Sequence, residues 1–198
     1  MILATNNKGK LEEIRKILKD YEIYSLKDKN IDVDVKEDEN TFEGNATKKA
    51  KEIYELTKEE TIADDSGLCI NALDGLPGVM THRFLGEEAT KEDRNNYILN
   101  KMKDFEDRSA QVICCLVYYN GKDIKISEGI LEGKIAKECR GNNGFGFDEI
   151  FELPNGKTLA ELSKEEKNKI SARALAAKQL IKKLKKNEDY DMNPVSWT

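Results

Sequence analysis

Residues 110–119 read AQVICCLVYY, and this run is the clearest strand in the sequence. β-branched and aromatic residues dominate it, and both kinds favour extended structure. The dipeptide Asn120-Gly121 follows and predicts a tight turn, so that residues 124–131 return as the second strand of a hairpin. The length of the first strand predicts that it is the central scaffold of a sheet.

Shorter elements are predicted around this hairpin. Apolar runs and alternation predict further strands, at residues 1–4, 23–26, 31–35 and 61–63. Apolar residues at helical spacing predict helices, at residues 11–18, 40–56, 91–103 and 163–186. Asn40 with Glu43, and Ser163 with Glu166, form the capping-box patterns expected at helix starts. We expect one domain over residues 1–186 and a polar C-terminal tail over 187–198, which is loose unless Trp197 docks.

Size, charge and cysteine spacing exclude several classes of protein. The 198 residues suffice for one substantial core, or for one core split into two lobes by a cleft. The net charge of -5 argues against binding to long nucleic acid, which needs a basic surface. No apolar run approaches the roughly 20 residues that span a bilayer, and the N-terminus lacks the features of a signal peptide, so we expect a cytoplasmic protein with no membrane partner. The four cysteines have no Cys-x-x-Cys spacing and are expected to be buried, reduced thiols.

Residues 63–68 read ADDSGL and form the first candidate site. They follow the short predicted strand 61–63, so we expect the strand to end at these polar residues. The adjacent carboxylates of Asp64 and Asp65 repel each other unless a positive charge lies beside them, which favours a divalent cation with a phosphate ligand. The alternative is a solvated Asp-Ser-Gly turn.

Residues 5–10 read TNNKGK and form a loop between a predicted strand and a predicted helix. Free N–H groups and the positive end of the helix dipole attract anions at such a helix start, and two lysines lie in the same loop. The loop is not a Walker motif, because Ala4 and Leu11 stand where that motif needs Gly and Ser or Thr. We expect a phosphate-binding loop; the alternative is a helix capped by Asn6 or Asn7 with solvated lysines.

Two further segments carry polar or aromatic groups that suit a nucleotide site. Glu37 follows the predicted strand 31–35 and would complete an oxygen site for Mg²⁺ if that strand end lies beside Asp64 and Asp65. The alternative is that the acidic cluster 37–39 only complements the dipole of the helix that follows. Residues 141–148 read GNNGFGFD, in which glycines let the backbone approach a flat ligand while an aromatic ring stacks on it. The alternative is that the two rings are core anchors.

The last helix sets a geometric condition. Lys167 and Arg173 lie roughly 120° apart on one straight helix, because an α-helix turns about 100° per residue. If both side chains contact one ligand, the helix must start later than Ser163 or be interrupted near Asn168. The only histidine, His82, lies beside Arg83 and is assigned no role.

Five ordered segments together resemble the inosine/xanthosine triphosphate pyrophosphatase family. They read TNNKGK at residues 5–10, TFEGNA at 41–46, IADDSGL at 62–68, GFGFD at 144–148 and EEKNKISAR at 165–173. The resemblance implies an α/β fold with a long mixed β-sheet, flanking helices and two lobes around a nucleotide-binding cleft. It also implies a homodimer that hydrolyses inosine, deoxyinosine and xanthosine triphosphates to the monophosphate and pyrophosphate with Mg²⁺.

The resemblance also assigns residues to roles. It implies that Asp65 is the proton acceptor and that Glu37 and Asp65 hold Mg²⁺. The implied substrate-binding residues are Thr5, Asn6, Asn7, Lys8, Gly9, Lys10, Lys49, Ser66, Phe145, Gly146, Phe147, Asp148, Lys167 and Arg173. Within this set residues 5–10, Lys49 and Lys167 would take the triphosphate, whereas residues 145–148 and Arg173 would face the purine.

One position departs from the family pattern. The family usually reads Ser-His-Arg where this chain reads Ser171-Ala172-Arg173, and Ala172 offers no side-chain hydrogen bond to a purine. We therefore expect weaker discrimination between bases than in relatives with the histidine. Two other functions use the same loops: a pyrophosphate-releasing hydrolase of other modified nucleotides, and a nucleotide-binding module without catalysis.

Overall fold

A six-stranded mixed sheet organises the computed structural model, which describes residues 1–191, with side chains to residue 185. In sheet order the strands are β2 (Tyr24–Ser25), β1 (Ile2–Leu3), β3 (Thr61–Ile70), β4 (Ser109–Tyr119), β5 (Ile124–Ile135) and β6 (Phe151–Glu152). The α-helices are α1 (Lys8–Ile17), α2 (Phe42–Thr57), α3 (Lys91–Lys101), α4 (Lys164–Ile170) and α5 (Ala172–Asp191). Short 3₁₀ helices are η1 (Lys27–Lys29), η2 (Asn71–Leu73), η3 (Gly78–Met80) and η4 (Leu159–Glu161).

The strand directions make the sheet mixed. β1 runs parallel to β2 and β3, whereas β3, β4, β5 and β6 pair antiparallel in that order. β4 lies between two long partners and pairs with β5 along its whole length, from Ser109 opposite Lys134 to Tyr119 opposite Ile124. The predicted α/β class with a long mixed sheet is therefore confirmed. The predicted hairpin of β4 and β5 is confirmed too, and β4 lies in the interior of the sheet.

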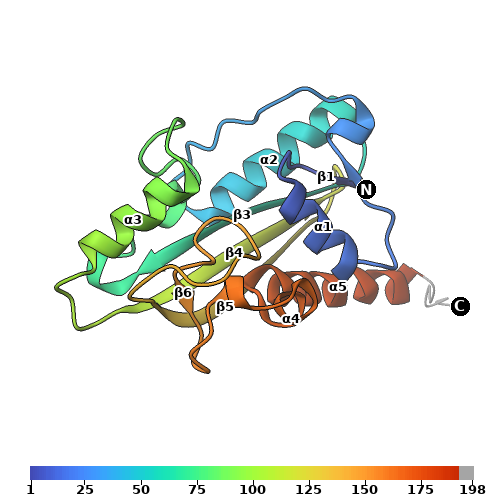
Figure 1. The fold of residues 1–198 in the computed structure, drawn as a ribbon. Coiled ribbons are helices and arrows are strands. Elements are labelled where there is room, and N and C mark those ends of the chain that lie inside the picture. Colours follow the sequence, from blue (N-terminus) through green and yellow to red (C-terminus); the bar gives the residue numbers. More distant parts are fainter. Residues whose placement is uncertain (192–198) are drawn as a thin grey trace, which may run out of the picture.

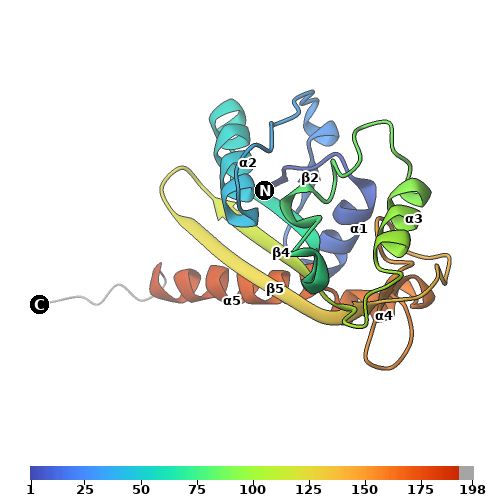
Figure 2. The same cartoon turned by 90° about the vertical axis from the view of Figure 1, so that its left-hand side faces the viewer.

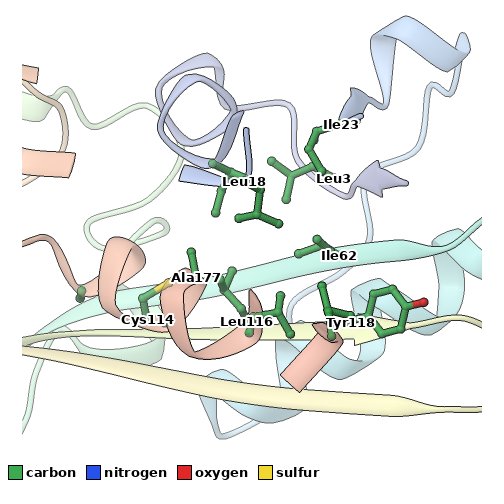
Figure 3. Close-up of a cluster of buried hydrophobic side chains, with 13 residues drawn as sticks. Leu3, Leu18, Ile23, Ile62, Cys114, Leu116, Tyr118 and Ala177 are labelled. Carbon is green, nitrogen blue, oxygen red and sulfur yellow. The ribbon is translucent and has the colours of Figure 1, made fainter. Parts of the chain in front are cut away.

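Helices cover both faces of the sheet (Figures 1 and 2). α2 lies over one face, and α5 lies along the other, where α1 packs against it. Successive side chains of a strand point to opposite faces, and the two cores follow that rule. Ile62, Cys114 and Leu116 face α1 and α5 (Figure 3). Ala63 and Cys115 face α2 instead.

A third cluster closes the far end of the sheet. Leu68 and Ile70 of β3 pack there with Ile98 of α3 and with Phe151 of β6. The free thiols are distributed unevenly, since Cys114 and Cys115 are buried as expected, whereas Cys139 is exposed and Cys69 is half-buried. Within residues 1–191 no helix combines the length and apolar character needed to span a bilayer.

Three predictions about individual elements are wrong. Residues 31–35 form no strand: their apolar side chains pack onto the α2-side core, but no neighbouring strand pairs with their backbone. α2 is capped by Thr41, whose hydroxyl accepts from the Gly44 N–H at 2.9 Å, and not by Asn40. α5 continues past the predicted end at Lys186 to Asp191. The predicted docking of Trp197 lies outside the described residues.

Candidate active site

The Thr5–Lys10 segment joins the end of β1 to the start of α1. Asn7 caps the helix, since its side-chain oxygen accepts from the Lys10 N–H at 3.2 Å. The Asn7 N–H in turn donates to Thr5 Oγ1 at 3.1 Å. Lys8 is exposed, whereas the side chain of Lys10 is only 6% exposed and turns inward. The cap that was predicted as an alternative is present, and the same helix start sends one lysine into the interior.

Asp64 and Asp65 lie in the middle of a strand and not at its end. β3 continues through both residues to Ile70 and pairs with β4 along its full length, so the prediction that the strand ends here is wrong. Because neighbours on a strand point to opposite faces, the two carboxylates are separated by the sheet. Asp64 faces α1 and α5, and Asp65 faces α2. The divalent cation expected beside these carboxylates stays a prediction, and it would lie on one face of the sheet.

The other edge of β3 is open beside these residues. β1 pairs only with Thr61 and Ile62 and ends there. From Ala63 onward no described strand pairs with this edge of β3. Nearer its end the edge is covered by the segment around η3, where the Leu68 N–H donates to Thr81 Oγ1 at 3.0 Å and an isolated bridge joins Cys69 to Pro77. Groups from both faces can therefore meet at this edge, next to the carboxyl end of β1. Crevices at the carboxyl ends of parallel strands are the usual ligand sites of α/β sheets.

Three cationic donors hold Asp64 on its face. Its Oδ2 accepts from Arg173 Nη2 at 3.0 Å and Nε at 3.2 Å, and Lys10 Nζ lies 3.1 Å away. Asp64 is 1% exposed, and its Oδ1 has no hydrogen-bond partner among the described residues. Although burial alone would raise the pKa of Asp64, the charges of Lys10, Arg173 and Lys49 hold it well below its ordinary value. Asp64 is therefore ionised throughout the physiological range.

Asp65 has a different environment on the other face. Its carboxylate accepts from Asn45 Nδ2 at 2.9 Å and from the Ser66 N–H at 2.9 Å. Burial and the negative charge of Glu37 raise its pKa, the charge of Lys49 and the hydrogen bond from Asn45 oppose them, and the net result is a pKa of about 6. A carboxyl that titrates near neutral pH is suited to accept a proton, so the environments of the two aspartates favour Asp65 as the base.

The donor set around Asp65 fits a hard divalent cation. Glu37 and Asp65 present carboxylate oxygens, which Mg²⁺ prefers, and the negative charge of Glu37 contributes to the raised pKa of Asp65. The Lys49 ammonium forms an ion pair with Glu37 and also affects the pKa of Asp65, so a positive charge already lies beside these two groups. Within residues 1–191 the structure contains no cluster of three or more His, Cys, Asp or Glu side chains arranged to bind a metal. Waters or substrate oxygens would have to complete the coordination.

The last helix is interrupted, as the geometric condition required. Ser171 has extended backbone angles (φ -58°, ψ 153°) and separates α4 from α5. The break lies three residues beyond Asn168, and it points both charged side chains into the site. Lys167 Nζ lies 2.5 Å from Asp148 Oδ2, and Arg173 Nη2 donates to Ser66 Oγ at 3.0 Å.

The glycine-rich loop folds onto the Thr5–Lys10 segment. Asp148 Oδ2 accepts from the Phe145 N–H at 2.9 Å, and Lys167 Nζ lies 4.1 Å from the centre of the Phe145 ring. The ring also packs on Gly9, where a Cβ would lie 2.8 Å from it. Phe147 is 8% exposed and belongs to the core at the end of the sheet, so for this ring the alternative of a core anchor is correct.

A cavity of about 250 Å³ joins these parts on the Asp64 side. Predicted residues that line it are Asn7, Ser66, Phe145, Gly146, Phe147, Asp148, Lys167 and Arg173. A second cavity, of about 310 Å³, adjoins it across Phe145 and is lined by Gly9, among others. Thr5, Asn6, Lys8 and Lys10 line neither cavity, although Lys10 contacts Asp64. Glu37, Lys49 and Asp65 lie together on the α2 side and line neither cavity.

Three residues without a predicted role take part in the site. Glu13 is 4% exposed and accepts from Arg173 Nη1 at 2.6 Å, so it fixes the guanidinium from the side opposite Asp64. Asn45 binds Asp65, and His82 lines the first cavity. Glu13 follows Lys10 at helical spacing, which is the one sequence signal that places it on the inward face of α1.

Comparison with known proteins gives consistent relatives. Residues 1–183 match the Ham1 family. The chain is 43% identical over 196 residues to a dITP/XTP pyrophosphatase of Clostridium perfringens, covering 93% of this chain and 96% of the relative. It is 42% identical over 189 residues to the dITP/XTP pyrophosphatase of Bacillus subtilis, covering 92% and 96%.

Solved structures agree with the sequence matches. The Ham1 protein of Staphylococcus aureus superposes with a TM-score of 0.86 at 37% identity, covering 94% of this chain and 98% of that chain. A HAM1 protein of Coxiella burnetii gives 0.85 at 39% identity, covering 93% and 98%. The resemblance stated from the five sequence segments is thereby confirmed.

Proposed function

This chain belongs to the Ham1 family, and from that premise we propose that it hydrolyses non-canonical purine nucleoside triphosphates to the monophosphate and pyrophosphate. Inosine, deoxyinosine and xanthosine triphosphates are the expected substrates, since the relatives at about 40% identity are dITP/XTP pyrophosphatases. The observation that carries the proposal is the convergence at the open edge of β3, where Lys10 of the helix-start loop lies 3.1 Å from Asp64. The carboxylate pair of Glu37 and Asp65 lies beside the same edge.

The residues divide the reaction between them. Asp65 orients a water and takes its proton, because its raised pKa lets it act as a base near neutral pH. Glu37 and Asp65 would hold Mg²⁺, which supplies polarisation of the α-phosphate and acidification of the attacking water when it is bound. Attack at the α-phosphate releases the β- and γ-phosphates together as pyrophosphate.

Lysines offset the charge of the leaving pyrophosphate. Three of them are each held by a carboxylate, in the pairs Lys10–Asp64, Lys49–Glu37 and Lys167–Asp148. Ammonium groups fixed in advance need little reorganisation when the leaving group gains charge, and such preorganisation is the main source of electrostatic catalysis. Residues 5–9 would add backbone donors at the start of α1, and Lys8 among them would add an ammonium group.

The purine would lie at the other end of the cavity. Phe145 offers a ring for stacking, Gly146 gives the loop its positive φ of 61°, and Asp148 and Arg173 offer polar groups. Phe147 supports the loop from the core, and Ser66 fixes Arg173. A site that hydrogen-bonds a 6-oxo group leaves the 6-amino group of adenine without a partner, which is the physical basis for rejecting ATP.

We further propose that the protein is a cytoplasmic homodimer with one catalytic domain over residues 1–186. The free thiols fit a reducing compartment. Exposed apolar side chains on β5, Ile124 and Ile130, are each 42% exposed and suit a protein interface. Light scattering at several protein concentrations would measure the oligomeric state.

A panel of triphosphates tests the reaction. ITP, dITP, XTP, ATP, GTP, dUTP and a methylated nucleotide are incubated with and without Mg²⁺, and pyrophosphate and orthophosphate are measured separately. We expect Mg²⁺-dependent pyrophosphate from the first three, with kcat/KM well above that for ATP. Orthophosphate as the product, or a preference for dUTP or the methylated nucleotide, would replace the proposal with one of the other hydrolases. Binding without any product would indicate a nucleotide-binding module.

A further inference from the structure

The only histidine of the chain lies beside a lysine of the phosphate loop. His82 follows η3 and lines the cavity that contains Ser66 and Arg173. Its Nε2 is 3.2 Å from Nζ of Lys10, and the same Nζ is 3.1 Å from Asp64 Oδ2. His82 is thus connected to Arg173 through Lys10 and Asp64, although it lies far from all three in sequence.

The partner of Nε2 decides the state of the ring. An ammonium group has three donors and no acceptor, so Nε2 must offer its lone pair. The imidazole is then neutral, and its proton is on Nδ1. The pKa of His82 is lowered by desolvation and by the charges of Lys10, Lys49 and Arg173, while Asp64 opposes them, in agreement with a neutral ring.

The remaining ring donor has no hydrogen-bond partner in the part of the chain that the structure describes. Among residues 1–191, Lys10 is the one group hydrogen-bonded to the His82 ring. His82 is exposed and lines the cavity, so the Nδ1–H is available to a ligand there. The two ring nitrogens point in nearly opposite directions, so an acceptor bound at Nδ1 and a group bound by the Lys10 ammonium lie on either side of the ring. An extended chain of several phosphates is long enough to reach both.

We propose that His82 contacts a phosphate oxygen of the bound nucleotide through Nδ1–H, while Nε2 holds Lys10 in position for the same phosphate chain. The inference rests on the proposed function, because it takes Lys10 as a triphosphate contact. It adds a neutral donor to the cations already assigned. A neutral ring also avoids placing a second positive charge against Lys10.

The phosphate assignment makes a distinctive prediction about specificity. All nucleoside triphosphates carry the same phosphate chain, so loss of His82 lowers kcat/KM by the same factor for every base and sugar. A contact to the purine would instead change the ratio of ITP to ATP. A contact to the ribose would change the ratio of ITP to dITP.

A single imidazole permits a direct test without turnover. In protein labelled with ¹⁵N-histidine, the ring nitrogens of His82 give the one imidazole signal of the chain. We expect the Nδ1–H tautomer at pH 7 and a shift of the Nδ1 signal on adding tripolyphosphate or a non-hydrolysable ITP analogue. An Nε2–H tautomer, an imidazolium ion, or signals unchanged at saturating ligand would overturn the inference.

Variants supply the kinetic test. His82→Ala should lower kcat/KM about 10- to 100-fold for ITP, dITP and ATP alike, the range expected for a lost hydrogen bond to a charged group. His82→Gln keeps an acceptor and a donor and should restore most of the rate. Met80→Ala, an exposed neighbour that lines neither cavity, is the matched control and should leave the rate unchanged.

The outcomes separate this inference from the proposed function. Rates of His82→Ala equal to those of the wild type, or a loss confined to one base or sugar, would overturn the inference while wild-type pyrophosphate release upholds the reaction. If the wild type releases no pyrophosphate from any triphosphate, the proposed function fails on the panel alone. Unequal melting temperatures of the His82 variants would be corrected by assaying below the lowest transition.

Discussion

Arg173 donates two hydrogen bonds to one oxygen of Asp64, from Nη2 at 3.0 Å and from Nε at 3.2 Å. The same oxygen lies 3.1 Å from Lys10 Nζ, so the ionised Asp64 holds two cationic side chains in place. Asp65, one residue further on, lies on the opposite face with its pKa raised to about 6. Adjacent carboxylates therefore have separate functions, one structural and electrostatic and the other suited to proton transfer.

Changing Asp65 to Asn should abolish turnover and leave nucleotide binding measurable. The amide cannot accept a proton from water, and loss of a positioned base costs typically 10²- to 10⁴-fold in rate. Single-turnover kinetics with ITP would measure the rate, and calorimetric titration with a non-hydrolysable analogue would measure binding. Near wild-type rates would remove Asp65 from this role.

Changing Asp64 to Asn should mainly reduce stability. The change leaves Lys10 without its carboxylate in the interior and Arg173 paired with Glu13 alone, and breaking a buried ion pair costs about 3–5 kcal/mol of unfolding free energy. Urea denaturation would measure the loss. Glu12→Gln, which removes the surface pair with Lys164, is the matched control and should change stability by less than about 0.5 kcal/mol. Equal effects of the two changes would contradict the buried network.

The raised pKa of Asp65 should make the metal-free protein less stable as the pH rises. The folded state keeps its proton up to about pH 6, whereas the unfolded carboxyl loses it near 3.8, so folded protein binds more protons between these values. The contribution of Asp65 to the unfolding free energy is fully present below about pH 4 and is lost as the pH rises through 6. The total loss is at most about 3 kcal/mol.

The Asp65→Asn variant isolates this contribution. Unfolding free energies of wild type and variant in EDTA should diverge between pH 4 and pH 6, with the variant relatively more stable at pH 7. Loss of the preferred geometry with Asn45 reduces the gain. Mg²⁺ should stabilise the wild type and not the variant. If the unfolding free energies of the two proteins change in parallel with pH, the pKa of Asp65 is not raised in the folded state.

Changing Ala172 to His should improve discrimination against ATP. Ala172 lines the cavity next to Arg173, so an imidazole there gains access to the base and adds a donor for a 6-oxo group. We expect the ratio of kcat/KM for ITP to that for ATP to rise up to about tenfold. Ala172→Leu adds bulk without a donor and is the control. Equal ratios in wild type and Ala172→His would count against this account.

Sequence patterns correctly predicted those elements that are determined by residues close together in the chain. The β4–β5 hairpin combines a β-branched, aromatic strand with Asn120-Gly121, and the Ser163 capping box correctly placed the start of α4. An interruption near Asn168 was one of two alternatives if Lys167 and Arg173 contact one ligand, and the helix is in fact interrupted at Ser171. In each case the deciding atoms lie within a few residues in the chain.

Residues that depend on distant partners were not predictable in this way. Asp-Asp-Ser-Gly has weak strand preference, and it continues β3 because Lys10, Lys49 and Arg173 make its buried charges tolerable. None of these three is near residue 64 in sequence. Residues 31–35 show the opposite error, since their alternation buries apolar side chains where no strand is present to pair with them.

The interruption at Ser171 determines which parts of the site can move. Gly129 of β5 lets the start of α5 approach closely, since a Cβ there would lie 2.0 Å from the Ala172 carbonyl oxygen, so Arg173 is anchored to the frame of the molecule. α4 has seven residues, none of them buried, and it carries Lys167, whose ammonium pairs with Asp148 of the glycine-rich loop. Nucleotide should therefore slow amide hydrogen exchange in α4 while leaving α5 unchanged. Arg173 therefore belongs to the part of the site that is built into the core, whereas Lys167 lies on a helix without buried residues.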